Sequence, residues 1–105
     1  MISAMNLKQM FLGTINSGKQ TVYTVPTTAD SAVVKELVIY NASSETTNVV
    51  IYINDVRLAA QDVDAGDSLF GDKTWYLVLN HGDRLQVQGS TSLNVLVSGV
   101  ETVSA

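Results

Sequence analysis

The hydrophobic positions of this chain fall in short runs rich in valine, isoleucine, leucine, tyrosine and threonine. β-Branched and aromatic side chains fit the pleated, half-buried surface of a strand. Polar and glycine-containing segments separate the runs at roughly ten-residue spacing, which is typical of sandwiches and barrels. The strands expected from these runs are Thr21–Val25, Ala32–Asn41, Asn48–Ile53, Val56–Ala59, Thr74–Leu79, Arg84–Gln88 and Leu93–Val100. The pattern predicts an all-β fold, an antiparallel sandwich of about seven to eight short strands, with immunoglobulin-like and jelly-roll topologies both open.

The period of two along a strand predicts which side chains share a face. In Arg84–Gln88, Leu85 and Val87 are expected to point inward, and the polar residues outward. The strand Ala32–Asn41 is apolar on both faces, so we expect it inside a sheet. Strict alternation would divide this strand into two sets, namely Val33, Lys35, Leu37 and Ile39, and Val34, Glu36, Val38 and Tyr40.

Turn chemistry separates the expected strands. Asn54-Asp55 is predicted to be a two-residue hairpin turn, because both residues tolerate positive φ. Asn80–Asp83 is a second predicted turn, in which Gly82 takes the positive φ. The stretch Gln61–Lys73 is rich in aspartate and glycine, and we expect a meandering loop with one or two very short strands.

The two ends of the chain differ in character. Residues 1–15 are predicted to be an N-terminal arm or a first strand, with Met10–Ile15 joining a sheet, although a short helix also fits. Residues 102–105 are expected to be a flexible tail. The N-terminal segment carries apolar side chains that a free arm would leave uncovered. These residues are the candidate interface of the chain: Met5, Leu7, Met10 and Phe11.

Composition narrows the class of protein. The 105 residues indicate one domain, residues 1–105, with 46% hydrophobic and 15% charged residues. A weakly charged surface favours packing against other copies or into an assembly. The net charge of −4 and the scattered lysine and arginine residues argue against a nucleic-acid or anionic membrane partner. Without cysteine the chain has no disulfide or thiolate metal site, and its first residues resemble neither a signal peptide nor a membrane span.

The residues that could bind a metal or take part in catalysis are better explained as turn and loop residues. Asp62, Asp64 and Asp67 surround Gly66, but the segment lacks the ligand pattern of a calcium loop. His81, which is the single histidine, lies in a predicted turn, and Ser98-Gly99 is not a nucleophile elbow. We therefore expect no enzyme, no cofactor and no metal.

Two further aspartates and a set of aromatic residues could also form a site, and each group has a structural explanation as well. Asp55 and Asp83 could serve a glycosidase in principle, but both are predicted turn residues. An aromatic platform for sugar or peptide is an alternative to core packing, and it would use Tyr23, Tyr40, Tyr52, Trp75 and Tyr76. The sequence Asn41-Ala42-Ser43 matches a glycosylation acceptor, which we interpret as chance.

Several strand and turn motifs follow one another along the chain. The first is Thr21–Pro26 (Thr-Val-Tyr-Thr-Val-Pro), which the strand Ala32–Asn41 follows. Three later motifs are Val49–Asn54, Leu79–Asp83 and Val95–Glu101. In these motifs the chain resembles small β-sandwich virion proteins of tailed bacteriophages. The resemblance covers about Leu12 to Glu101, and its motifs are strands and turns rather than catalytic groups.

The resemblance implies a structural role in the virion. The expected function is capsid decoration or stabilisation, after synthesis in the cytoplasm of the bacterial host. The expected partners are other copies of the chain, as a homotrimer, and a capsid or tail lattice protein. A tail- or fibre-associated module that binds a receptor or carbohydrate is the alternative.

Overall fold

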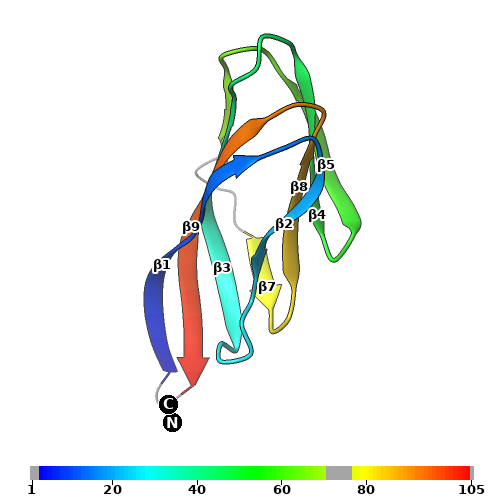
Figure 1. Cartoon of the computed structure of the whole chain (residues 1–105). Helices are drawn as coiled ribbons and strands as arrows, with labels where there is room; N and C mark the ends of the chain where they lie inside the picture. Colours follow the sequence, from blue (N-terminus) through cyan, green and yellow to red (C-terminus); the bar gives the residue numbers. More distant parts are fainter. Residues whose placement is uncertain (1–2, 71–76, 105) are drawn as a thin grey trace.

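The computed structural model describes residues 3–70 and 77–104. These residues form nine strands in two antiparallel sheets that pack face to face, and no helix (Figure 1). The structure confirms the prediction of an all-β sandwich. Its dimensions of 51 × 24 × 22 Å make it elongated along the strands.

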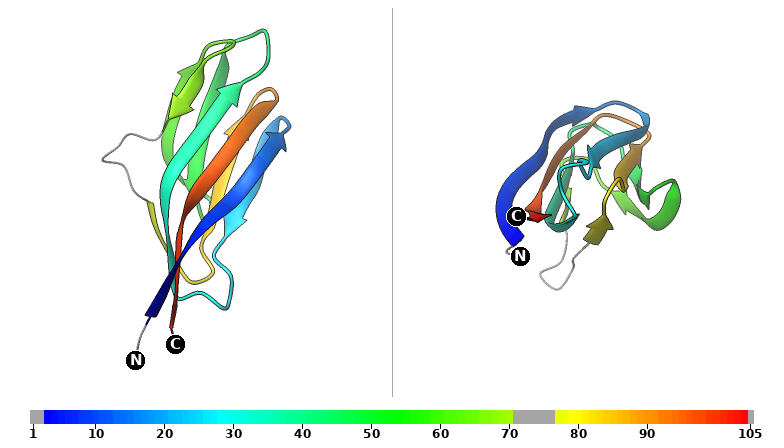
Figure 2. Two further views of the ribbon diagram at one scale, coloured as in Figure 1. Left: turned by 90° about the vertical axis from the view of Figure 1, so that its left-hand side faces the viewer. Right: turned by 90° about the horizontal axis from the view of Figure 1, so that it is seen from below.

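The first sheet, sheet A, contains both ends of the described chain. Its strand order is β1 (Ser3–Ile15), β9 (Leu93–Ser104), β3 (Ser31–Asn41) and β6 (Ser68–Phe70). The short strand β7 (Leu77–Asn80) pairs with the first half of β3, and β6 pairs with its second half. β3 is therefore an interior strand, as predicted, and β1 is an edge strand along its whole length (Figure 2).

The second sheet, sheet B, has the order β2 (Gly18–Thr24), β8 (Arg84–Gly89), β4 (Thr47–Ile53) and β5 (Val56–Val63). The β4–β5 hairpin turns at Asn54 and Asp55, whose φ angles are 51° and 65°. Gly82 has a φ of 80° in the turn between β7 and β8. Both predicted turns are confirmed.

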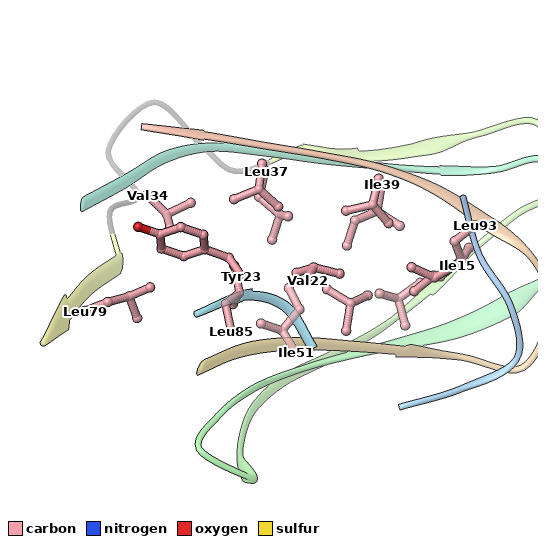
Figure 3. Packing of buried hydrophobic residues seen from close by; sticks show 14 of the residues in the cluster. Ile15, Val22, Tyr23, Val34, Leu37, Ile39, Ile51, Leu79, Leu85 and Leu93 are labelled. Atoms are coloured by element: carbon pink, nitrogen blue, oxygen red, sulfur yellow. The ribbon is translucent and has the colours of Figure 1, made fainter. Parts of the chain in front are cut away.

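The core lies between the sheets and consists mostly of aliphatic side chains. Leu37 and Ile39 of sheet A face Ile51 and Leu85 of sheet B across this layer (Figure 3). Leu85 and Val87 are fully buried, as the alternation predicted. Burial of these side chains supplies the main stabilisation of such a fold, at roughly 25 cal/mol per Å² of apolar surface.

Two β-bulges in sheet A correct the predicted alternation. Met10 in β1 and Lys35 in β3 are extra residues at register shifts against β9. A bulge adds one residue to one strand, so the side chains beyond it change faces. In β3 the buried side chains are therefore Ala32 and Val34 before the bulge, and Leu37 and Ile39 after it. The strict division of this strand into two faces was wrong at Lys35.

The bulge in β3 requires a glycine on the neighbouring strand. Gly99 of β9 lies beside it, paired with Val34. A Cβ atom on Gly99 would overlap the carbonyl oxygen of Val33, far inside any allowed contact. The absence of a side chain at Gly99 thus lets the two backbones approach.

The ends of several strands differ from the sequence prediction. Residues 102–104 were expected to be part of a flexible tail, but they belong to β9. Thr102 pairs with both β1 and β3, whereas residues 103 and 104 pair with β1 alone. The expected arm is a strand from Ser3 onward rather than from Met10, because β9 offers a partner along its whole length. β5 continues to Val63, while β6 is the one short strand described between Val63 and Phe70. Residues 74–76 of the expected strand Thr74–Leu79 lie outside the described residues, and β7 ends at Asn80.

Candidate interaction surface

The four residues predicted as an interface divide into two pairs. Met5 and Leu7 are 71% and 87% exposed, on the face of sheet A that points away from the core. Met10 and Phe11 are partly buried and pack against the core. The bulge at Met10 explains the division, because it turns Phe11 inward. The bulge also turns Leu12 outward, where its side chain is 67% exposed. The sequence pattern did not predict this exposure, because the pattern does not show the bulge.

The outer face of sheet A carries two apolar rows that cross the strands. Directly paired residues of neighbouring strands lie on the same side of a sheet. The first row, here the Leu7 row, follows the register through four strands: Leu7, Val100, Val33 and Val78. The second row, the Leu12 row, follows it through three strands: Leu12, Leu96 and Val38. Both ends of the Leu7 row are open to solvent, since Leu7 is 87% exposed and Val78 is 66% exposed.

A polar strip separates the two rows. Gln9, Ser98 and Glu36 are paired in register across β1, β9 and β3, and the bulged Lys35 adjoins them. A shallow hollow of about 420 Å³ opens here, over Ser98 and Gly99. No hydrogen bond or ion pair joins Lys35 or Glu36 to another residue that the structure describes. The outer face is thus apolar, polar and apolar in succession.

On the inner side of sheet A, the buried carboxylate of Glu101 links strands of the two sheets. The Tyr23 hydroxyl and the Lys8 ammonium both donate to Glu101 Oε2, at 2.5 and 3.1 Å. Burial raises the pKa of Glu101, but the hydrogen bonds from Tyr23 and Lys8 outweigh burial and leave that pKa below its ordinary value of 4.5. Burial and the neighbouring Glu101 hold the pKa of Tyr23 well above its usual range. The ionised carboxylate is therefore a structural link between β2, β9 and β1.

The carboxylates that a glycosidase would need hold two turns, the β4–β5 hairpin and the turn between β7 and β8. Asp55 accepts from Lys19 at 2.8 Å, Arg84 at 3.0 Å and Gln86 at 2.9 Å. These donors, the lysine first, hold the pKa of Asp55 well below its usual range. Asp83 accepts from the Asn54 amide at 2.8 Å and from the main-chain N–H of Asn80, and both bonds lower its pKa. Gln86 lies on the outer face, as predicted, yet is buried under this network.

The residues of the other candidate sites are not gathered by the fold. His81 Nδ1 lies 3.1 Å from the carbonyl oxygen of Ala29, while Ser98 lies within β9. Asp62 accepts from the Asn48 side chain, at 2.9 Å. Within residues 3–70 and 77–104, no group of three or more histidine and acidic side chains is arranged to hold a metal ion. Asp72, a further aspartate of the stretch Gln61–Lys73, lies outside the described residues.

The tyrosines of the proposed aromatic platform lie in three different places. Tyr23 is in the core, Tyr40 is on the outer face of sheet A, and Tyr52 is on the outer face of sheet B. Lys19 Nζ lies 4.8 Å from the centre of the Tyr52 ring, and the Tyr52 hydroxyl donates to Gln88 at 2.6 Å. Trp75 and Tyr76 lie outside the described residues.

The matched glycosylation sequence has a structural role. Asn41 is fully buried, and its amide donates to the carbonyl oxygens of Glu45 and Val63 at 2.7 and 2.8 Å. Its side-chain oxygen accepts from the main chain and the hydroxyl of Ser43. Asn41 therefore fixes the loop between β3 and β4. A polar hollow of about 540 Å³ opens beside this loop, lined mainly by serine and threonine residues.

Comparison with solved structures supports the fold assignment. Over 99% of its length the chain is similar to a chain in the structure of infectious bursal disease virus, Gx strain, with a TM-score of 0.53 and 10% identity. It is also similar, again over 99%, to part of a GH26-CBM35 β-(1,4)-mannanase of Podospora anserina, with a TM-score of 0.54 and 14% identity. The chain spans 32% and 26% of these two proteins. At such identities the similarity establishes the fold alone.

Other comparisons give no family. No protein-family model matches the sequence, and no curated protein matches it significantly. Among the described residues, no helix is long and apolar enough to cross a membrane.

Proposed function

We propose that this chain is a structural protein of a bacteriophage virion, which decorates or stabilises the capsid by binding. The observation that carries the proposal is the exposed apolar surface of sheet A, where Leu7, Met5, Leu12 and Val78 are each 66% or more open to solvent. Large apolar side chains that gather on one exposed face in this way mark an interaction site.

The chemistry of the polar residues supports a binding role rather than catalysis. Asp55 and Asp83 are held by turn donors, and Glu101 is held by Tyr23 and Lys8. Their hydrogen bonds are satisfied inside the fold, so they stabilise it. The likeness of the fold to a chain of a virus structure, and the resemblance of the sequence motifs to phage virion proteins, support the virion as its location.

Purified particles test the proposal. Virions from a bacterial culture that produces this chain are banded on a density gradient, and the chain is detected in each fraction by mass spectrometry. We expect the chain in the band that holds the capsid protein. Its recovery only at the top of the gradient would refute a virion role.

A pair of matched variants tests the surface. Leu7→Asp places a charge on the outer face of sheet A, whereas Leu58→Asp places one on β5 of sheet B, where Leu58 is 50% exposed. Leu7→Asp should deplete the chain from the particle band, and Leu58→Asp should not. Equal depletion by both variants would contradict the assignment of the surface.

A receptor- or carbohydrate-binding module of a tail or fibre is the second candidate. The observation in its favour is Tyr52, whose ring lies on the outer face of sheet B beside Lys19 and Gln88. The neighbour that is a mannanase with a CBM35 module is consistent with it. Saturable heat on titration with a panel of soluble oligosaccharides, abolished by Tyr52→Ala, would favour this candidate over decoration.

A further inference from the structure

The outer face of sheet A has a symmetric pattern about its polar strip. In β3, Val33 lies two residues before Lys35 and Val38 lies two residues after Glu36. In β9, Leu96 lies two residues before Ser98, and Val100 lies two residues after it. The midpoints of β1, β3 and β9 fall on the polar strip. On β3 and β9 the Leu7 row and the Leu12 row therefore lie equally far from it.

We propose that this face binds the same face of a second copy of the chain, through a two-fold axis that crosses the strands along the polar strip. Such an axis passes between Lys35 and Glu36. It places the Leu7 row of one copy against the Leu12 row of the other, so that both apolar rows are covered, and the chain then reaches the capsid as a dimer whose assembly requires Leu7. A two-fold interface uses one patch twice, and this patch is complementary to itself.

The charges of the strip favour a second copy over another occupant. Lys35 and Glu36 are adjacent, exposed and opposite in charge, and they lie on either side of the proposed axis. The axis brings Lys35 of each copy opposite Glu36 of the other, which forms two reciprocal ion pairs. Lys8 also borders the hollow, and its ammonium is paired with Glu101 at 3.1 Å. Complementary charges of this kind fix register and exclude wrong partners.

The hollow over Ser98 and Gly99 gives these side chains room. It is bordered by Lys35, Glu36 and Gln9, and Gly99 contributes no side chain to its floor. A lysine side chain from the facing copy can enter it beside Glu36. A trimer, in contrast, needs two different patches that fit each other. The structure thus favours a dimer over the homotrimer that the sequence resemblance implies.

Light scattering after gel filtration tests the stoichiometry of the full chain. We expect twice the monomer mass, independent of any capsid protein, so this inference can fail while the virion proposal stands. A monomer at all concentrations or a trimer would overturn it. A monomer that still requires Leu7 to reach the particle band would instead assign the face to a lattice partner.

Charge reversal tests the two-fold geometry. In the Lys35→Glu variant only carboxylates face each other across the axis, and in the Glu36→Lys variant only ammonium groups do. Each single variant should dissociate into monomers, and the double variant, with both charges exchanged, should dimerise again. An equimolar mixture of the two single variants should form a mixed dimer, because each provides the charges that the other lacks.

Controls separate this result from damage to the fold. Arg57→Glu reverses an exposed charge on β5 of sheet B and should leave the dimer unchanged. Circular dichroism should be the same for every charge variant, since Lys35 and Glu36 are exposed. Leu7→Thr should raise the dissociation constant about tenfold, by exposing less apolar surface for burial. A dimer that persists in both single charge variants would overturn the proposed face.

Discussion

Buried polar residues connect segments that are distant in the sequence. Glu101 receives hydrogen bonds from Tyr23 and Lys8, 78 and 93 residues away. The Asn41 amide donates to two carbonyl oxygens, one of which belongs to Val63, 22 residues further along the chain. Every buried side-chain nitrogen and oxygen among the described residues has a partner. Since an unpaired buried polar group costs about 1–3 kcal/mol, these contacts specify the packing of the two sheets.

Glu101→Gln should make the free energy of unfolding less dependent on pH. The folded-state pKa of Glu101 lies below its ordinary value of 4.5, so the ionised group stabilises the fold above that pH. This stabilisation is lost as the pH falls through the folded-state pKa. We expect the variant to be about 1–3 kcal/mol less stable than the natural chain at neutral pH, because charged hydrogen bonds are lost.

Urea denaturation between neutral pH and pH about 3 measures the effect of Glu101→Gln, and the difference between the two proteins should shrink toward acid. Glu45→Gln, which changes an exposed carboxylate in the β3–β4 loop, is the matched control and should leave the curve unchanged. A constant difference at all pH values would contradict the assigned role of the Glu101 charge.

Gly99→Ala should be among the most damaging single substitutions. The added Cβ would overlap the Val33 carbonyl oxygen, and main-chain atoms cannot move aside as a side chain can. We expect a loss of about 3 kcal/mol or more, measured by urea denaturation. Gly13→Ala is the control, because its Cβ would meet the end of the Phe11 ring at 3.3 Å. Similar stability of the two variants would contradict the close approach at the bulge.

At the scale of elements, turns were predictable and bulges were not. Asn54-Asp55 and Gly82 indicate their turns because positive φ restricts the residue type. The bulge at Lys35 has no such sequence signature, since almost any type of residue can occupy a bulge position in a strand. Two consequences of the bulges were therefore missed: the inward turn of Phe11 and the exposure of Leu12. The core positions after each bulge also change faces.

Asn54→Ala should destabilise the β4–β5 hairpin for two reasons. Alanine adopts the observed φ of 51° with difficulty, and the variant loses the bonds to Asp83 and to the Arg84 main chain. Asn54→Gly loses the same bonds but adopts that φ freely. The alanine variant should thus be about 1–2 kcal/mol less stable than the glycine variant in urea denaturation. Equal stabilities would indicate that the side-chain bonds alone matter.

At the scale of the whole molecule, the sequence predicted the fold class and the presence of an apolar surface, but not its shape. Runs of β-branched residues define strands by themselves, whereas sheet order depends on long-range pairing that a local pattern does not encode. β9 pairs with β1 and β3, which lie at the other end of the sequence. That pairing aligns Leu7 with Val100 and Val33, so the surface exists only in the folded chain.

The pairing of β1 with β9 also brings the two ends of the described chain together. Ser3 lies opposite Ser104, at one tip of the elongated molecule (Figure 1). A domain with adjacent ends can be inserted into a loop of another protein, because it enters and leaves at one point and opens neither fold. The same geometry permits circular permutation, with a short linker joining the ends and new termini at the Asn54-Asp55 hairpin. For engineering, another protein can thus carry this fold at the end that holds Ser3 and Ser104, with the opposite tip pointing away from the carrier.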